Sequence, residues 1–117
     1  MLGRLAFLLL ASLLALPLHS SPSPKAKNDY ALIFGTVWAP DSRPAFGVPI
    51  AIRKASEKKA RWHLTSDHSG EFAQRVPPGA QDYVIEAEVK TPKGEPKPQV
   101  TVHIDDNERQ DVSLHLQ

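Results

Sequence analysis

The residues best suited to acid–base catalysis or metal binding lie close together, in and just before the stretch TSDHSGEF at positions 65–72. Asp67, His68 and Glu71 belong to this stretch, and His63 lies two residues before it. A catalytic zinc site needs three such ligands at about 2.0–2.2 Å from the metal. If the strands expected on either side pair with each other, His63 and Glu71 share one exposed face. The spacing matches no known metal motif, so we expect no metal site.

The same stretch is well suited to form a turn. The Asp67 carboxylate can accept hydrogen bonds from the turn backbone, and Gly70 can adopt a positive φ that other residues resist. Phe72 is then the first core residue of the next strand. This interpretation predicts that His68 is exposed and replaceable.

Two further histidines, His103 and His115, lie outward on the last two expected strands. A hairpin turn at Asp106–Asn107 would place His103 opposite Asp111, a cross-strand pair worth about 0.2–1 kcal/mol. It would leave His115 several residues away along the ladder. The sequence contains no nucleophile elbow and no glycine-rich phosphate loop. We therefore expect no catalytic residues, no cofactor and no enzymatic activity.

The basic residues concentrate in one segment beside Trp62, and the chain offers two aromatic residues near its first loop. The basic residues are Arg53, Lys54, Lys58, Lys59 and Arg61. Such a cluster can bind nucleic acid or an acidic polysaccharide, or it can be a solvated hairpin tip that discourages edge-to-edge pairing.

Trp38 and Phe46 can form a carbohydrate or protein contact surface, or they can cover the core. The possible ligand contacts are Trp38, Phe46, Arg53, Lys58 and Arg61.

These residues must be positioned by strands, because the chain from Asp29 to Gln117 alternates apolar and polar residues and has turn residues every 8–12 positions. The expected strands are 31–38, 48–54, 61–65, 71–76, 82–90, 99–104 and 110–116. Each has one apolar face, which predicts two sheets packed against each other. The sequence thus predicts an all-β fold, a seven-stranded antiparallel-type Greek-key β-sandwich, in residues 29–117.

The first twenty residues have the pattern of a secretory signal. Arg4 precedes an apolar run, from Leu5 to Leu18, that is shorter than the roughly 20 residues needed to span a bilayer. We expect cleavage near Ser20, with a retained N-terminal anchor as the alternative. Residues 21–28, SPSPKAKN, are expected to be a flexible linker.

Charge and cysteine content narrow the possible partners. The chain has 14 basic and 13 acidic residues, and Arg4 lies in the expected signal, so the mature domain is formally neutral. No long-range field attracts it to nucleic acid or to an anionic membrane. The absence of cysteine excludes disulfides and thiolate metal sites.

The strand pattern resembles the carboxypeptidase regulatory-like domain, a transthyretin-like (prealbumin-like) β-sandwich. The resemblance covers residues 31 to about 116, and it rests on short pieces of sequence. They are Ile33-Phe34-Gly35-Thr36-Val37, Gly47, Pro49-Ile50, Thr65, Asp67, Gly70, Phe72, Pro78-Gly79 and Tyr83. It implies a domain that is usually non-catalytic. The hydroxyisourate hydrolases share this fold and end in Tyr-Arg-Gly-Ser, whereas this chain ends in Ser113-Leu114-His115-Leu116-Gln117.

The sequence therefore predicts an exported, secreted or periplasmic module. We expect it to bind a protein or a polysaccharide of the cell envelope, with no nucleic-acid partner and no membrane span after signal cleavage. The pattern predicts no particular oligomeric state. The alternative is a small hydrolase of the transthyretin-like branch that uses His63, His103 or His115.

Overall fold

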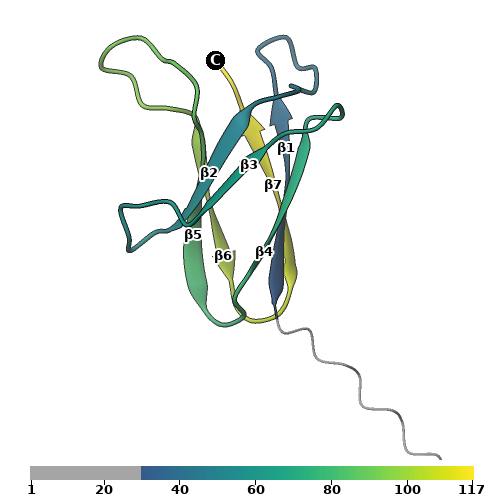
Figure 1. Cartoon of the computed structure of the whole chain (residues 1–117), viewed down its shortest axis with the longest axis vertical. Helices are drawn as coiled ribbons and strands as arrows, with labels where there is room; N and C mark the ends of the chain where they lie inside the picture. The colour runs from purple at the N-terminus through teal and green to yellow at the C-terminus, as the bar shows by residue number, and fades with distance from the viewer. Residues whose placement is uncertain (1–29) are drawn as a thin grey trace, which may run out of the picture.

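A computed structural model describes residues 30–117, and these residues form seven β-strands and no helix. The expected signal at 1–20 and the expected linker at 21–28 lie outside the described residues. The strands are β1 (Ala31–Trp38), β2 (Pro49–Lys54), β3 (Trp62–Thr65), β4 (Glu71–Val76), β5 (Gln81–Ala87), β6 (Gln99–Ile104) and β7 (Arg109–His115). They form one sheet in the order β4-β1-β7 and another in the order β3-β2-β5-β6 (Figure 1). The predicted all-β, two-sheet fold is confirmed.

The predicted strand limits agree with the structure to within one residue, except at the end of β5. β1, β4 and β6 have the predicted limits, and β2, β3 and β7 differ from them by one residue at one or both ends. β5 ends at Ala87 instead of Lys90 because both of its neighbours end there. Its pairing with β2 ends at Ile50 opposite Ala87, and its pairing with β6 ends at Gln99 opposite Glu86. Residues 88–90 thus belong to the following loop.

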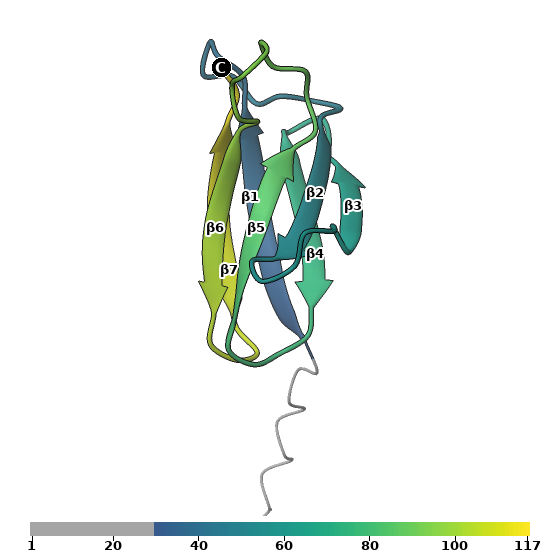
Figure 2. The ribbon, with the colours of Figure 1, turned by 90° about the vertical axis from the view of Figure 1, so that its left-hand side faces the viewer.

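Two of the expected hairpins are wrong. Strands β3 and β4 belong to different sheets, as do β6 and β7, so each short turn passes from one layer to the other. Figure 2 shows this division, with β6, β5, β2 and β3 in front of β7, β1 and β4. β7 pairs with β1, and this pair is parallel, whereas every other strand pair is antiparallel among residues 30–117. A period-two pattern specifies which side chains face inward, but it does not specify which strand is the neighbour.

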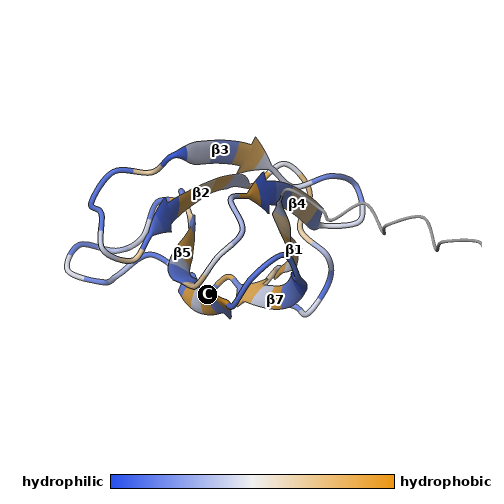
Figure 3. Cartoon of the chain, turned by 90° about the horizontal axis from the view of Figure 1, so that it is seen from below, coloured by the Kyte–Doolittle hydropathy of each residue, from blue (hydrophilic) through white to orange (hydrophobic). Residues whose placement is uncertain are grey.

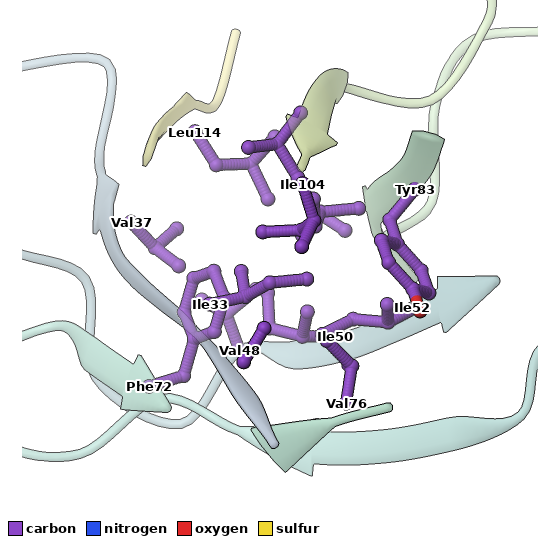
Figure 4. Close-up of a cluster of buried hydrophobic side chains, with 14 of the residues drawn as sticks. Ile33, Val37, Val48, Ile50, Ile52, Phe72, Val76, Tyr83, Ile104 and Leu114 are labelled. Carbon is purple, nitrogen blue, oxygen red and sulfur yellow. The ribbon is translucent and has the colours of Figure 1, made fainter. Parts of the chain in front are cut away.

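The core lies between the two sheets, where each strand presents its apolar face (Figures 3 and 4). In β1, Ile33 and Val37 are fully buried, and Gly35 lies between them. The Phe72 ring of β4 occupies the space over Gly35, where a Cβ atom would lie 2.2 Å from the ring Cζ. Gly35 thus leaves the space that the Phe72 ring occupies, and any larger residue there would displace the ring.

Within residues 30–117, no helix is long and apolar enough to cross a bilayer.

Candidate functional site

The loop between β2 and β3, residues 55–61, carries most of the predicted basic cluster, and two arginines hold its shape. Arg53 donates from Nη1 to the carbonyl oxygens of Ala55 and Glu57, at 3.3 and 2.9 Å. Arg61 makes a two-point contact with the Glu57 carboxylate, at 2.8 and 2.7 Å. This contact lowers the pKa of Glu57. Arg61 therefore helps to fix the conformation of the loop, and its charge is paired with Glu57 instead of being free.

Lys58 and Lys59 are the free charges of this loop. Both side chains are exposed, and neither forms an ion pair within residues 30–117. They lie at the tip of the loop, which projects in front of the four-stranded sheet in Figure 2. The hydrogen bonds of Arg53 and Arg61 thus support the β2–β3 loop, on which the ammonium groups of Lys58 and Lys59 are exposed without an ion-pair partner among residues 30–117.

A groove with a volume of about 440 Å³ lies between this loop and the outer face of the sheet. Neighbouring strands supply its floor, because Ala51 of β2 is paired with His63 of β3 on one side and with Glu86 of β5 on the other. Arg53 is likewise paired with Val84. The volume is within the range of small-molecule sites, about 300–1,000 Å³.

Two small apolar residues of the floor are buried although the floor belongs to the outer face of the sheet. The exposed fractions of Ala51 and Val84 are only 7% and 6%. The β2–β3 loop, through Lys58, Lys59 and Ala60, lines the same groove. The structure therefore has a partly open recess on this face of the sheet.

The side of the groove away from the loop is acidic. Glu86 and Glu88 project from the same face, two residues apart, and Lys97 of the following loop lies 3.8 Å from Glu88. Partial burial raises the pKa of Glu86, and the neighbouring Glu88 carboxyl raises it further. The groove therefore has unpaired cations on one wall and a carboxyl pair on the other.

The predicted aromatic contacts take two different environments. The Phe46 side chain is 61% exposed and stacks on His68, with ring centroids 4.0 Å apart and an interplanar angle of 7°. Trp38 is half-buried and stacks on His115 at 6.5 Å. Neither tryptophan nor phenylalanine lines the groove. The stack on Phe46 is a contact of His68 that the sequence did not predict, although His68 is exposed as expected.

The loop that carries Phe46 is fixed by a buried serine. Ser66 is 2% exposed, accepts a hydrogen bond from the Val48 amide at 2.9 Å and donates one to the Ala45 carbonyl at 2.6 Å. The Gly47 amide donates to the Ser66 carbonyl at 3.0 Å. Phe46 is therefore held outward on a well-anchored loop.

The residues first considered as metal ligands do not converge. Because β3 and β4 lie in different sheets, His63 and Glu71 do not share a face, and that expectation is wrong. Asp67 Oδ1 instead accepts hydrogen bonds from the amides of Ser69 and Glu71, at 2.9 and 2.8 Å, as a turn residue does. Residues 30–117 contain no group of three side chains placed to hold a metal ion.

The three histidines of the hydrolase alternative lie on three different strands. His63 and His103 are at opposite edges of the four-stranded sheet, three strand spacings apart. His63 is in register with Gln99 of β6, four residues from His103, so the two histidines are roughly 20 Å apart. His115 belongs to the other sheet. The structure does not bring them into one site.

His103 does have acidic partners, but not the predicted one. It lies opposite Asp82 on β5, at 2.5 Å, and also contacts Asp105 at 2.8 Å, whereas Asp111 is in the other sheet. The hydrogen bonds to Asp82 and, second, to Asp105 raise the pKa of His103. The predicted His103–Asp111 pair is wrong because β6 pairs with β5 instead of β7.

Glu86, Glu88 and Lys97 are the groove residues that sequence reasoning did not select. The alternation of the 82–90 run does place both glutamates on the outward face. What the sequence lacks is the strand order, which puts β5 next to β2 and so brings these carboxyls under the basic loop.

Comparison with known proteins supports the fold only. No family model matches the chain, and no curated protein matches it. Solved structures with a transthyretin-like sandwich do match, at low sequence identity. The 5-hydroxyisourate hydrolase of Klebsiella pneumoniae is 15% identical with a TM-score of 0.55, and the match covers 74% of this chain and 91% of that one.

Two pilins also match. GBS52, the minor pilin of Streptococcus agalactiae, is 17% identical with a TM-score of 0.58, over 75% of this chain. This chain spans only 44% of GBS52. The C-terminal domain of the shaft pilin SpaA of Lactobacillus rhamnosus is 11% identical with a TM-score of 0.51, over 75% of this chain and 98% of that one.

Proposed function

We propose that this protein is an exported, non-catalytic binding module of the carboxypeptidase regulatory-like type. It acts outside the cytoplasm, at the cell envelope, and holds a polar ligand in the groove on the outer face of the four-stranded sheet. The observation that carries the proposal is the convergence of Lys58, Lys59, Glu86 and Glu88 from separate segments around one groove on the outer face of the sheet.

The proposed location has two supports. The N-terminal sequence has the three parts of a secretory signal. In addition, two of the structures that share the fold are described as pilins. Both supports favour a secreted or periplasmic protein that meets its partner in the envelope.

The proposed absence of catalysis is supported by the placement of the histidines. A general base must lie within hydrogen-bonding reach of the proton that it removes, and an activated nucleophile needs such a base beside it. His63 and His103 are far apart across the sheet, and His103 is occupied by Asp82 and Asp105. Binding, by contrast, needs only the charged recess that the groove supplies.

The test is retention of the purified protein on isolated envelope material. We expect the double variant Lys58→Glu/Lys59→Glu to lose at least about tenfold in retention, since it reverses both free charges of the loop. Lys93→Glu is the control, because Lys93 is exposed and lies outside the groove. Equal retention of the double variant and the wild type would contradict the proposed site.

The non-catalytic part of the proposal has its own assay. The purified protein is incubated with hydroxyisourate and with a panel of simple esters. We expect no turnover above the buffer rate. Turnover that disappears in His63→Ala would establish the hydrolase alternative instead.

A further inference from the structure

We infer that the ligand of the groove is an acidic polysaccharide, a chain of hydroxyl-bearing sugar rings with carboxylate groups. In this arrangement the carboxylates of the sugar lie against Lys58 and Lys59, and its hydroxyl groups lie against Glu86 and Glu88. The inference rests on the proposed function, because it assigns a ligand class to the same groove.

The basic wall selects for negative charge. Lys58 and Lys59 have no acidic partner within the described residues 30–117, whereas Arg61 is neutralised by Glu57. His63, on the edge strand of the same floor, is exposed and can add a further donor. An anionic group that enters the groove therefore meets uncompensated cations and does not have to displace an existing ion pair.

The acidic wall limits which anions fit. Ionised carboxylates accept hydrogen bonds but donate none. Glu88 has Lys97 as an ion-pair partner, whereas no ion pair of Glu86 is present among residues 30–117, so Glu86 favours a ligand with hydroxyl or amine donors. A nucleic acid carries a phosphate on every nucleotide and a polyuronate carries a carboxylate on every uronate ring, so both bring negative charge to the basic wall. The uronate also carries hydroxyl donors on the same ring as the carboxylate, and these can face the glutamates. Its mixed chemistry matches a groove with both kinds of wall.

The floor disfavours a peptide ligand. β2 and β5 are the two central strands of their sheet, so their backbone groups are already paired on both sides. An extended peptide usually gains affinity by adding main-chain hydrogen bonds to a free strand edge. Over β2 and β5 the groove offers it no such edge, so recognition there depends on side chains. The small side chains of Ala51 in the floor and Ala60 in the loop leave room for a ring.

The inference is tested by affinity electrophoresis and calorimetry with the purified protein and three linear uronate polymers, namely polygalacturonate, alginate and hyaluronan. We expect at least one of them to bind. Fully methyl-esterified polygalacturonate is the matched ligand control, since it has the same rings without the charge, and we expect it to bind at least about tenfold more weakly. Binding of the acid should also weaken as salt rises.

A matched pair of variants places the binding in the groove. Lys58→Glu should weaken binding of the uronate polymer about tenfold, because it replaces a charge-assisted contact by a repulsive one. Lys93→Glu makes the same charge change at another exposed lysine that does not line the groove, and it should have little effect.

Three results would overturn the inference. They are failure of all three uronate polymers to bind, equal binding of the methyl-esterified polymer, and equal or tighter binding of a single-stranded oligonucleotide. The outcome is separable from that of the proposed function. If envelope retention still depends on Lys58 and Lys59 while the uronates fail, the groove is the binding site but its ligand is not an acidic polysaccharide.

Discussion

Gly70 and Gly47 offer an internally controlled test of how the turn before β4 is packed. Their φ angles are nearly equal, +74° and +76°. A Cβ atom at Gly70 would lie 2.8 Å from the Val37 carbonyl oxygen and 2.9 Å from the Pro44 Cβ, whereas at Gly47 nothing lies within 4 Å. Alanine at either position has a backbone cost of about 1–2 kcal/mol. Only Gly70→Ala adds steric overlap, which typically costs about 1–3 kcal/mol more.

The expected loss of unfolding free energy is therefore about 1–2 kcal/mol for Gly47→Ala and about 2–5 kcal/mol for Gly70→Ala. Urea denaturation of both variants and the wild type measures it, provided that the slopes agree. The Gly70 carbonyl also accepts a hydrogen bond from the Val37 amide at 2.7 Å, so a shift that relieves the overlap disturbs β1. Equal losses for the two variants would refute the argument, since they would mean that the turn yields freely.

Two further predictions concern Ser66 and His103. Ser66→Ala leaves a buried amide and a buried carbonyl unpaired, so we expect it to lower the unfolding free energy, measured by urea denaturation, by about 2–4 kcal/mol. The control Ser69→Ala, at an exposed position, should lower it by about 0.5 kcal/mol or less. Similar losses for the two variants would contradict this prediction. Because its acidic partners raise the pKa of His103 above 6.5, its contribution to stability should be complete below pH 6.5 and disappear as the pH rises through the folded-state pKa. The difference in unfolding free energy between wild type and His103→Gln, measured at pH 5.5 and at pH 9, tests this. An NMR titration of Asp82→Asn should show a lower His103 pKa than in the wild type. A stability difference that grows with pH would refute the prediction.

The strands could be predicted from the sequence because their information is local. Alternation of apolar side chains in 31–38 and 71–76 determines an inward face, and the turn residues that flank them determine the limits. Gly70 follows the same logic, since a polar turn with a glycine indicates a positive φ. These features depend only on residues that are close in the chain.

The groove could not be predicted because it depends on strand order. Lys58 and Glu86 are 28 positions apart, and no local pattern states that β5 pairs with β2. The same gap explains the mistaken His103–Asp111 pair. A polar turn after β6 is compatible both with a hairpin and with passage to the other sheet, and the residue types at 105–108 do not distinguish the two connections.

The parallel pairing of β1 and β7 has a mechanical consequence. β1 begins at Ala31 at one end of the sandwich, and β7 finishes at His115 near the other end, as both arrows in Figure 1 show. Tension applied between these two residues therefore pulls the strands past each other along their length. Seven registered residue pairs, from Leu32–Arg109 to Trp38–His115, resist that sliding together. Separation of the two strands by such a force requires many hydrogen bonds to break at once instead of one after another.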